Sequence, residues 1–192
     1  MAKLLGVVLS GGESRRMGRD KGLLPIQDTA WAKYVAAKLE ALALPVVVSV
    51  NAAQWSNYNR LFSSETLVLD TVAIVEGPLR GLLSVHQQYP TQDLLLLACD
   101  MIDMEQATLE KLIAVYQQEP DYDAYVYQNE ELIEPFGAVY TARCLANTLR
   151  KAVSGALSRY SLKSVVESGD ARRLLGVQGS SFKNYNTCTN QK

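Results

Sequence analysis

The sequence lacks the residues of several familiar catalytic centres. It contains one histidine, His86, to which we assign no role, and it offers no Ser-His-Asp or Cys-His pairing for nucleophilic catalysis. Its three cysteines, Cys99, Cys144 and Cys188, include no close Cys-x-x-Cys pair of the kind used in zinc or redox sites. This odd and sparse set of thiols is typical of a reducing compartment, and we expect a cytoplasmic protein.

The sequence also lacks a charge excess and a long hydrophobic run. Nineteen basic residues nearly cancel twenty acidic ones, so no global attraction to nucleic acid or to an anionic membrane is expected. No run approaches the roughly 18 apolar residues of a membrane-spanning helix. The apolar stretch 4–9 is short and leads into a charged loop, so we interpret it as a strand rather than a signal peptide. A length of 192 residues suits a single domain over 1–192, and a hydrophobic content of 48% is enough for a core.

Apolar runs alternate with helical patterns over the first 119 residues. Continuous runs of this kind predict strands buried on both faces of a parallel sheet. The predicted strands are 4–9, 46–50, 66–69, 93–100, 122–127 and 136–140. The predicted helices are 29–42, 54–62, 82–89, 105–119, 143–153 and 158–168, with a turn at 76–81. The alternation predicts an α/β fold of three layers (α/β/α) around a mainly parallel, Rossmann-like sheet.

Three features fall at the carboxyl ends of predicted strands: a glycine-rich loop after the first strand, Asp70 at the end of the third, and Asp100 at the end of the fourth. Ligands in parallel sheets bind outside the carboxyl ends of the strands. We therefore expect these three segments to meet at one edge of the sheet. Asp100 is suited to Mg²⁺, which prefers oxygen ligands and usually binds through one or two carboxylates together with nucleotide phosphates.

The loop itself, LSGGESRRMGRDKG at 9–22, combines glycines with cations. Successive backbone N–H groups at Gly11 and Gly12 can hold phosphates, because glycine has no side chain to block the approach. Arg16 and Lys21 could neutralise the phosphate charge. Neither the G-x-x-x-x-G-K-[ST] pattern nor the G-x-G-x-x-G fingerprint is present, so the loop is neither a P-loop nor a typical dinucleotide-binding turn.

The loop does match the pattern L-x-G-G-x-S-x-R-M-G-x-D-K, at Leu9, Gly11, Gly12, Ser14, Arg16, Met17, Gly18, Asp20 and Lys21. This pattern resembles the signature of nucleotidyltransferases. Its Gly-Gly form, followed by Asp-Lys, is most similar to the molybdenum cofactor guanylyltransferase (MobA-like) family. The resemblance implies the nucleotide-diphospho-sugar transferase type of fold. It also implies a Mg²⁺-dependent enzyme that transfers GMP from GTP to molybdopterin with release of pyrophosphate, in transient contact with other cofactor-biosynthesis or molybdoenzyme proteins.

The resemblance also implies roles for individual residues. Lys21, Arg16 and Asp100 are expected to be catalytic, with Asp100 holding the metal. Nucleotide binding is expected at Leu9, Ser10, Gly11, Gly12, Lys21, Asn51, Asp70, Gly77, Pro78 and Asp100, where Gly77 and Pro78 belong to a G-P-L-x-G loop. Residues 1–119 would form the nucleotide-binding half and residues 120–192 the acceptor half. Asn184 and Asn186 in FKNYNT resemble acceptor-side asparagines of the family, although Tyr185 departs from its pattern and the terminal helix is missing.

Three other interpretations remain open. The first is a cytidylyltransferase of the same fold, acting on molybdopterin or on methylerythritol phosphate, although those relatives usually show Ala-Ala-Gly where this chain has LSGG. The second is a sugar-phosphate nucleotidyltransferase domain, for which the chain is short. The third is a nucleotide-binding regulator without turnover, which the altered carboxyl terminus favours. Release of pyrophosphate distinguishes an enzyme from such a regulator.

Overall fold

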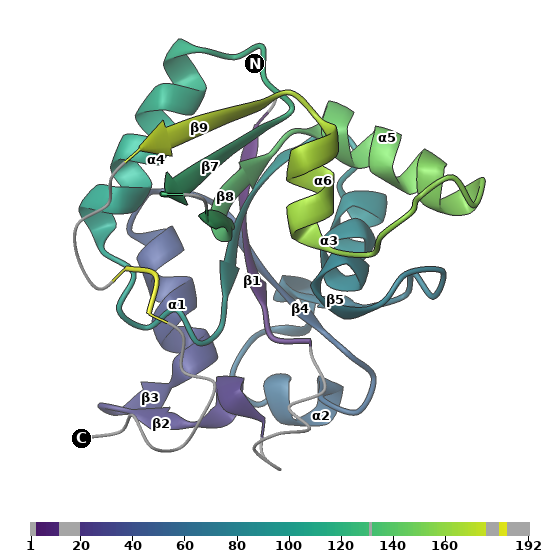
Figure 1. Cartoon of the computed structure of the whole chain (residues 1–192). Coiled ribbons are helices and arrows are strands. Elements are labelled where there is room, and N and C mark those ends of the chain that lie inside the picture. The colour runs from purple at the N-terminus through teal and green to yellow at the C-terminus, as the bar shows by residue number, and fades with distance from the viewer. Residues whose placement is uncertain (1–2, 12–19, 131, 176–180, 184–192) are drawn as a thin grey trace.

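The computed structural model describes residues 3–11, 20–130, 132–175 and 181–183. A seven-stranded sheet forms the centre of this part of the chain (Figure 1). Its strands lie in the order β5 (Leu67–Leu69), β4 (Val46–Val50), β1 (Leu4–Leu9), β6 (Asp93–Ala98), β8 (Leu132–Tyr140), β7 (Ala124–Asn129) and β9 (Ala171–Leu175). All neighbouring pairs are parallel except those of β8, which runs antiparallel to both β6 and β7. The sheet is therefore mainly parallel, as the sequence predicts.

Strand β1 shows why its residues form a continuous apolar run. Leu5, Val7 and Leu9 belong to the hydrophobic cluster on one face of the sheet, whereas Leu4 and Val8 belong to the cluster on the other face. Successive side chains of a strand point to opposite faces, so a strand covered on both sides needs apolar residues at consecutive positions.

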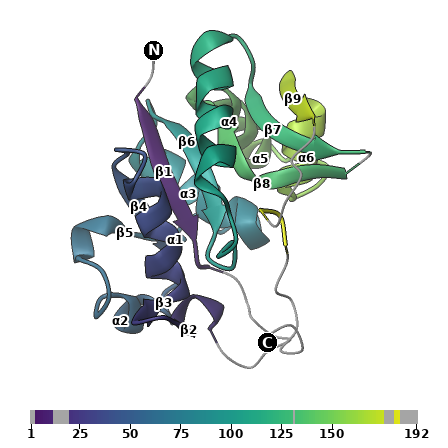
Figure 2. The same ribbon diagram turned by 90° about the vertical axis from the view of Figure 1, so that its left-hand side faces the viewer.

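Helices cover both faces of the sheet and complete the three predicted layers. Helices α3 (Gly77–Gln88), α5 (Ala142–Val153) and α6 (Leu162–Ser168) pack on one face. Helices α1 (Trp31–Glu40) and α4 (Gln106–Gln118) pack on the other (Figures 1 and 2). No helix among the described residues is long and apolar enough to cross a membrane.

Gly6 allows α1 to lie close against β1. A Cβ atom added at Gly6 would lie 3.2 Å from Leu39 Cβ and 3.3 Å from Val46 Cγ2, which is tighter than most packed contacts. A larger residue at this position would push α1 away from the sheet. The buried side chains of α1 recur at helical spacing, so they lie on one face of a helix with 3.6 residues per turn. These residues are Trp31, Ala32, Val35, Ala36 and Leu39.

Smaller elements gather at the carboxyl end of β1, where both views place α2 (Trp55–Tyr58) and a two-stranded ribbon (Figures 1 and 2). The ribbon pairs β2 (Pro25–Ile26) with β3 (Thr29–Ala30), and the short 3₁₀ helix η1 (Lys21–Leu23) precedes it. The sequence predicts a helix from Thr29, but α1 begins at Trp31. Thr29 and Ala30 are extended because they pair with Ile26 and Pro25.

One further prediction of local structure is wrong, and one strand has no counterpart among the predictions. The predicted turn at 76–81 is the first part of α3, because Gly77 and Pro78 occupy the first helical positions, where proline needs no N–H partner. Strand β9 was not predicted at all. Its sequence, ARRLL, places two arginines inside the strand and shows neither alternation nor a continuous apolar run.

Candidate active site

The parallel strands bring four segments to one edge of the sheet. Ser10 directly follows β1, Asn51 follows β4, Asp70 follows β5, and Asp100 lies two residues beyond β6. Because β5, β4, β1 and β6 are neighbours and run in the same direction, all four carboxyl ends lie at the same edge. The segments that the sequence predicts to converge therefore do lie at a common edge.

An ion pair at this edge joins Lys21 to Asp100. Lys21 Nζ lies 2.9 Å from Asp100 Oδ2, and the two side chains are only 16% and 18% exposed. Partial removal from water strengthens the attraction between the two charges. An ammonium group has three donors and a carboxylate has about four acceptor positions, so both groups can make further contacts. The pair therefore places a cation suited to phosphate beside a carboxylate suited to a metal ion.

Asp20, which precedes Lys21, is held by three donors from different parts of the site. Its Oδ1 accepts hydrogen bonds from the Gly22 backbone N–H at 3.0 Å and from the Tyr58 hydroxyl at 3.0 Å. Its Oδ2 accepts from Gln54 Nε2 at 2.7 Å. The bond to Gly22 caps η1, so Asp20 fixes the start of the short helix that carries Lys21.

Gln54 is buried and uses both ends of its side-chain amide. Its Nε2 donates to the Ser10 carbonyl at 2.9 Å as well as to Asp20. Its Oε1 accepts from the Asn51 backbone N–H, and Asn51 Oδ1 in turn accepts from the Gln54 backbone N–H, both at 3.1 Å. This reciprocal pair is a capping box at the start of the turn that leads into α2. It anchors Gln54 to the end of β4.

Asp70 is a partly buried carboxylate at the edge. Its burial raises the pKa of the carboxyl group, while the hydrogen bond from the Ser49 hydroxyl and the charge of Arg80 act in the opposite direction. Two glycines allow this enclosure. A Cβ added at Gly11 would overlap Asp70 Oδ2, and one added at Gly81 would overlap the Ser49 hydroxyl. Glycine is required at both positions by close approach.

The other residues predicted for the site fall into three groups. Leu9 and Ser10 are buried at the end of β1, and Asn51 is half-buried with its amide oxygen bonded to Gln54. Gly77 and Pro78 are exposed at the start of α3, and it is Gly81, one turn later, that lies against Asp70. Gly12, Arg16, Asn184 and Asn186 lie outside the described residues.

The donor set at the edge can be compared with the needs of a metal ion. Among residues 3–11, 20–130, 132–175 and 181–183, no group of three or more histidine, cysteine, aspartate or glutamate side chains is placed to enclose a metal. Zinc in a structural site requires four such ligands. Mg²⁺ is commonly bound by one or two carboxylates, phosphate oxygens and water. Asp100 together with a bound triphosphate fits the second pattern.

Cys99 lies beside Asp100 and is almost completely buried. Its burial and, to a smaller extent, the charge of Asp100 raise the pKa of the thiol to about 12. The thiol is therefore neutral at physiological pH, and a neutral buried thiol is a poor nucleophile. Cys99 contributes packing rather than chemistry.

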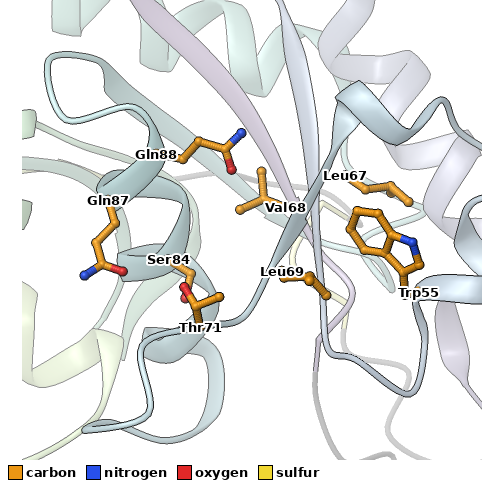
Figure 3. Close-up of a pocket in the computed structure, with 8 residues that line it drawn as sticks. All are labelled: Trp55, Leu67, Val68, Leu69, Thr71, Ser84, Gln87 and Gln88. Atoms are coloured by element: carbon orange, nitrogen blue, oxygen red, sulfur yellow. The ribbon is translucent and has the colours of Figure 1, made fainter.

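A separate open groove of about 410 Å³ lies between Trp55 of α2, strand β5 and the end of α3 (Figure 3). Leu67, Leu69 and Gln87 are among its lining residues, and none of the lining residues carries a charge. An uncharged lining does not suit a triphosphate. A cation suited to phosphate lies instead in the Lys21–Asp100 ion pair of the edge.

Sequence reasoning missed Gln54, Tyr58 and Ser49 as residues of the site. One signal for Gln54 was present, because Asn51-x-x-Gln54 has the spacing of a capping box. That spacing predicts only the local turn. The bonds from Gln54 to Ser10 and Asp20 depend on two segments that are 44 and 34 residues away in the sequence.

Comparison with known proteins gives consistent matches. The family model described as the MobA-like NTP transferase domain matches residues 6–173. The chain is 36% identical over 128 residues to a molybdenum cofactor biosynthesis bifunctional protein of Synechocystis sp., a match that covers 67% of this chain but only 35% of that protein. It is 28% identical over 187 residues to a probable molybdenum cofactor guanylyltransferase of Methanothermobacter thermautotrophicus, covering 93% of this chain and 92% of the relative.

A solved structure supports the same fold. The crystal structure of molybdopterin-guanine dinucleotide biosynthesis protein A from Archaeoglobus fulgidus aligns with a TM-score of 0.69 and 17% sequence identity. The alignment covers 88% of this chain and 82% of the other. At this level of identity the likeness concerns the arrangement of strands and helices alone.

Proposed function

Because the chain belongs to the MobA-like NTP transferase family, we propose that it is a molybdenum cofactor guanylyltransferase, which transfers GMP from GTP to molybdopterin and releases pyrophosphate. The observation that carries the proposal is the Lys21–Asp100 pair at the carboxyl edge of the sheet, with Nζ and Oδ2 2.9 Å apart. Relatives named as guanylyltransferases, one of them matched over almost its whole length, support the choice of substrates.

In the proposed reaction an oxygen of the terminal phosphate of molybdopterin attacks the α-phosphorus of GTP. A new P–O bond forms, the bond from the α-phosphorus to the oxygen bridging to the β-phosphate breaks, and pyrophosphate leaves with that electron pair. Such a transfer depends on positioning and charge stabilisation more than on acid–base residues. Lys21 Nζ would bind the triphosphate and stabilise the negative charge that develops on the leaving pyrophosphate.

The two carboxylates would have different tasks. Asp100 would hold Mg²⁺, which when bound offsets the negative charge of the triphosphate. Asp70, enclosed between Gly11 and Gly81, would accept hydrogen bonds from the nucleoside. Guanine presents N–H donors along one edge, which a carboxylate can accept.

Thermal unfolding with GTP, CTP and ATP, each with and without Mg²⁺, tests the nucleotide. A ligand at about 100 times its dissociation constant stabilises the folded state by roughly 2.7 kcal/mol, which a melting curve detects readily. We expect stabilisation by GTP that increases with Mg²⁺. Stabilisation by CTP alone would replace the proposal with a cytidylyltransferase, and no stabilisation by any nucleotide would overturn it.

Pyrophosphate release tests the transfer itself. We expect pyrophosphate only when GTP, Mg²⁺ and molybdopterin are all present. Stabilisation by GTP without any release of pyrophosphate would instead identify a nucleotide-binding regulator. An assay that replaces GTP with CTP serves as the control for nucleotide choice.

A further inference from the structure

We propose that Gln54 is a positioning residue that ties together the two ends of the phosphate-binding loop and thereby sets Lys21 opposite Asp100. This inference rests on the proposed function, because Lys21 is assigned there to the triphosphate. Gln54 itself lies one residue before α2, outside the loop and outside the signature that the loop matches.

One amide group makes the connection. Ser10 lies at the start of the loop and Asp20 at its end, and Gln54 Nε2 donates one hydrogen bond to each, at 2.9 and 2.7 Å. The amide cannot turn away, because its Oε1 accepts from the Asn51 backbone N–H. Gln54 is 8% exposed, so water competes little for these bonds.

Asp20 links the Gln54 amide to the backbone of Lys21. The Asp20 carboxylate binds Gln54 through Oδ2, and through Oδ1 it caps the helix that begins at Lys21. Tyr58 donates to the same Oδ1 from the end of α2. The orientation of Asp20, and with it the backbone of Lys21, is therefore fixed from α2. Lys21 reaches Asp100 from this fixed backbone.

The chemistry of the site requires an amide at position 54. Glutamate has the same length but, when ionised, has no donor for either the Ser10 carbonyl or Asp20, and it would place a second negative charge beside the Asp20 carboxylate. Leucine fills a similar volume and donates nothing. The pair Gln54→Glu and Gln54→Leu therefore separates loss of the donors from added repulsion.

The experiment measures kcat and KM for GTP, GTP-dependent thermal stabilisation and hydrogen–deuterium exchange for both variants. Asn57→Leu is the matched control, because Asn57 is an exposed amide on α2, three residues after Gln54. We expect Gln54→Leu to lower kcat/KM for GTP about 10- to 100-fold, the usual effect of removing a group that orients a functional side chain. KM for the molybdopterin acceptor should stay unchanged, and exchange at the peptide spanning 20–23 should accelerate.

The pH profile distinguishes positioning from general destabilisation. In Gln54→Glu, acidification allows one proton to be shared between the carboxyl groups at positions 54 and 20, which restores a donor to Asp20. Its kcat/KM deficit should therefore be smaller near pH 6 than near pH 8, whereas the deficit of Gln54→Leu should not change with pH. A residue that only supports the fold would lower the melting temperature and leave both profiles parallel to that of the unsubstituted protein.

Different experimental results would contradict each of the two proposals. If the unsubstituted chain binds no nucleotide, the proposed function is wrong, while faster exchange at 20–23 in Gln54→Leu would still support the connection from Gln54 to Lys21. If the unsubstituted chain transfers GMP and Gln54→Leu retains its kcat/KM and its exchange rate at 20–23, the positioning role of Gln54 is wrong.

Discussion

Replacing Lys21 with methionine separates the contribution of this side chain to the fold from its contribution to catalysis. Lys21 Nζ is 2.9 Å from Asp100 Oδ2, with side-chain exposures of 16% and 18%. Exposed ion pairs contribute about 0.2–1 kcal/mol, and loss of one partner from a fully buried pair costs about 3–5 kcal/mol. For this partly buried pair we expect Lys21→Met to lower the free energy of unfolding by about 1–2 kcal/mol, between these limits.

Two measurements test the effects of Lys21→Met on stability and on turnover. In a chain of this size, 1 kcal/mol corresponds to a shift of roughly 2–4 °C in melting temperature, so Lys21→Met should melt about 2–8 °C lower in the absence of nucleotide. Its turnover should fall about 100-fold or more, as for the loss of a single electrostatic donor. Melting curves and pyrophosphate release at saturating GTP measure the two effects on the same preparation.

The double variant Lys21→Met/Asp100→Asn makes the test specific. Removing both charges leaves neither unpaired, so the melting temperature should recover most of the loss seen in Lys21→Met. Turnover should not recover, because the groups proposed for the triphosphate and the metal are both absent. Recovery of turnover together with stability, or near-normal turnover of Lys21→Met alone, would refute the catalytic role of Lys21.

Three other predictions follow from the packing and the pKa shifts. Gly81→Ala should lower both the melting temperature and the GTP-dependent stabilisation, because its Cβ would overlap the Ser49 hydroxyl; an unchanged crystal position of Asp70 in that variant would contradict this. Asp70→Asn should weaken GTP binding without lowering stability at neutral pH, because burial raises the pKa of the carboxyl and its charged form is therefore less favourable in the folded than in the unfolded chain; calorimetry measures both. Burial lowers the pKa of His86, so as pH falls below about 6.5 the unfolded chain binds a proton that the folded chain does not, and stability should decrease. His86 is the only histidine of the sequence, so denaturant unfolding of His86→Gln should show a flatter profile between pH 7 and pH 5.5.

The central strands and their ends could be predicted from the sequence because they depend on local pattern. A strand covered on both faces needs a continuous apolar run, as at 4–9 and 94–98, and the polar residue that ends such a run marks the edge of the sheet. Asp70 and Asp100 could be named for this reason. Strand β9 could not be predicted from its sequence. It lies at the edge of the sheet, where it pairs in parallel with β7, and its two arginines interrupt any apolar pattern.

The contacts within the site could be predicted only in part. The Asn51-x-x-Gln54 spacing indicates a helix start, but nothing in it indicates that the Gln54 amide also reaches Ser10 and Asp20. Those bonds exist because β1 and β4 are adjacent in the sheet, which is a property of topology and not of local sequence. The sequence predicts site roles for Lys21 and Asp100 separately, whereas their direct contact appears only in the structure.

The two outermost strands also affect how the protein behaves in concentrated solution. An outer strand presents unpaired backbone groups to which another chain can add, and a short or charged outer strand discourages this. Strand β5 has three residues, and β9 carries Arg172 and Arg173, of which Arg172 is bound to Glu119 at 2.7 Å. Within the part of the chain that the structure describes, the sheet therefore ends on each side in a strand that is a poor template for aggregation. Substituting valine for both arginines would remove this protection on the β9 side and lower the concentration at which the folded protein begins to associate.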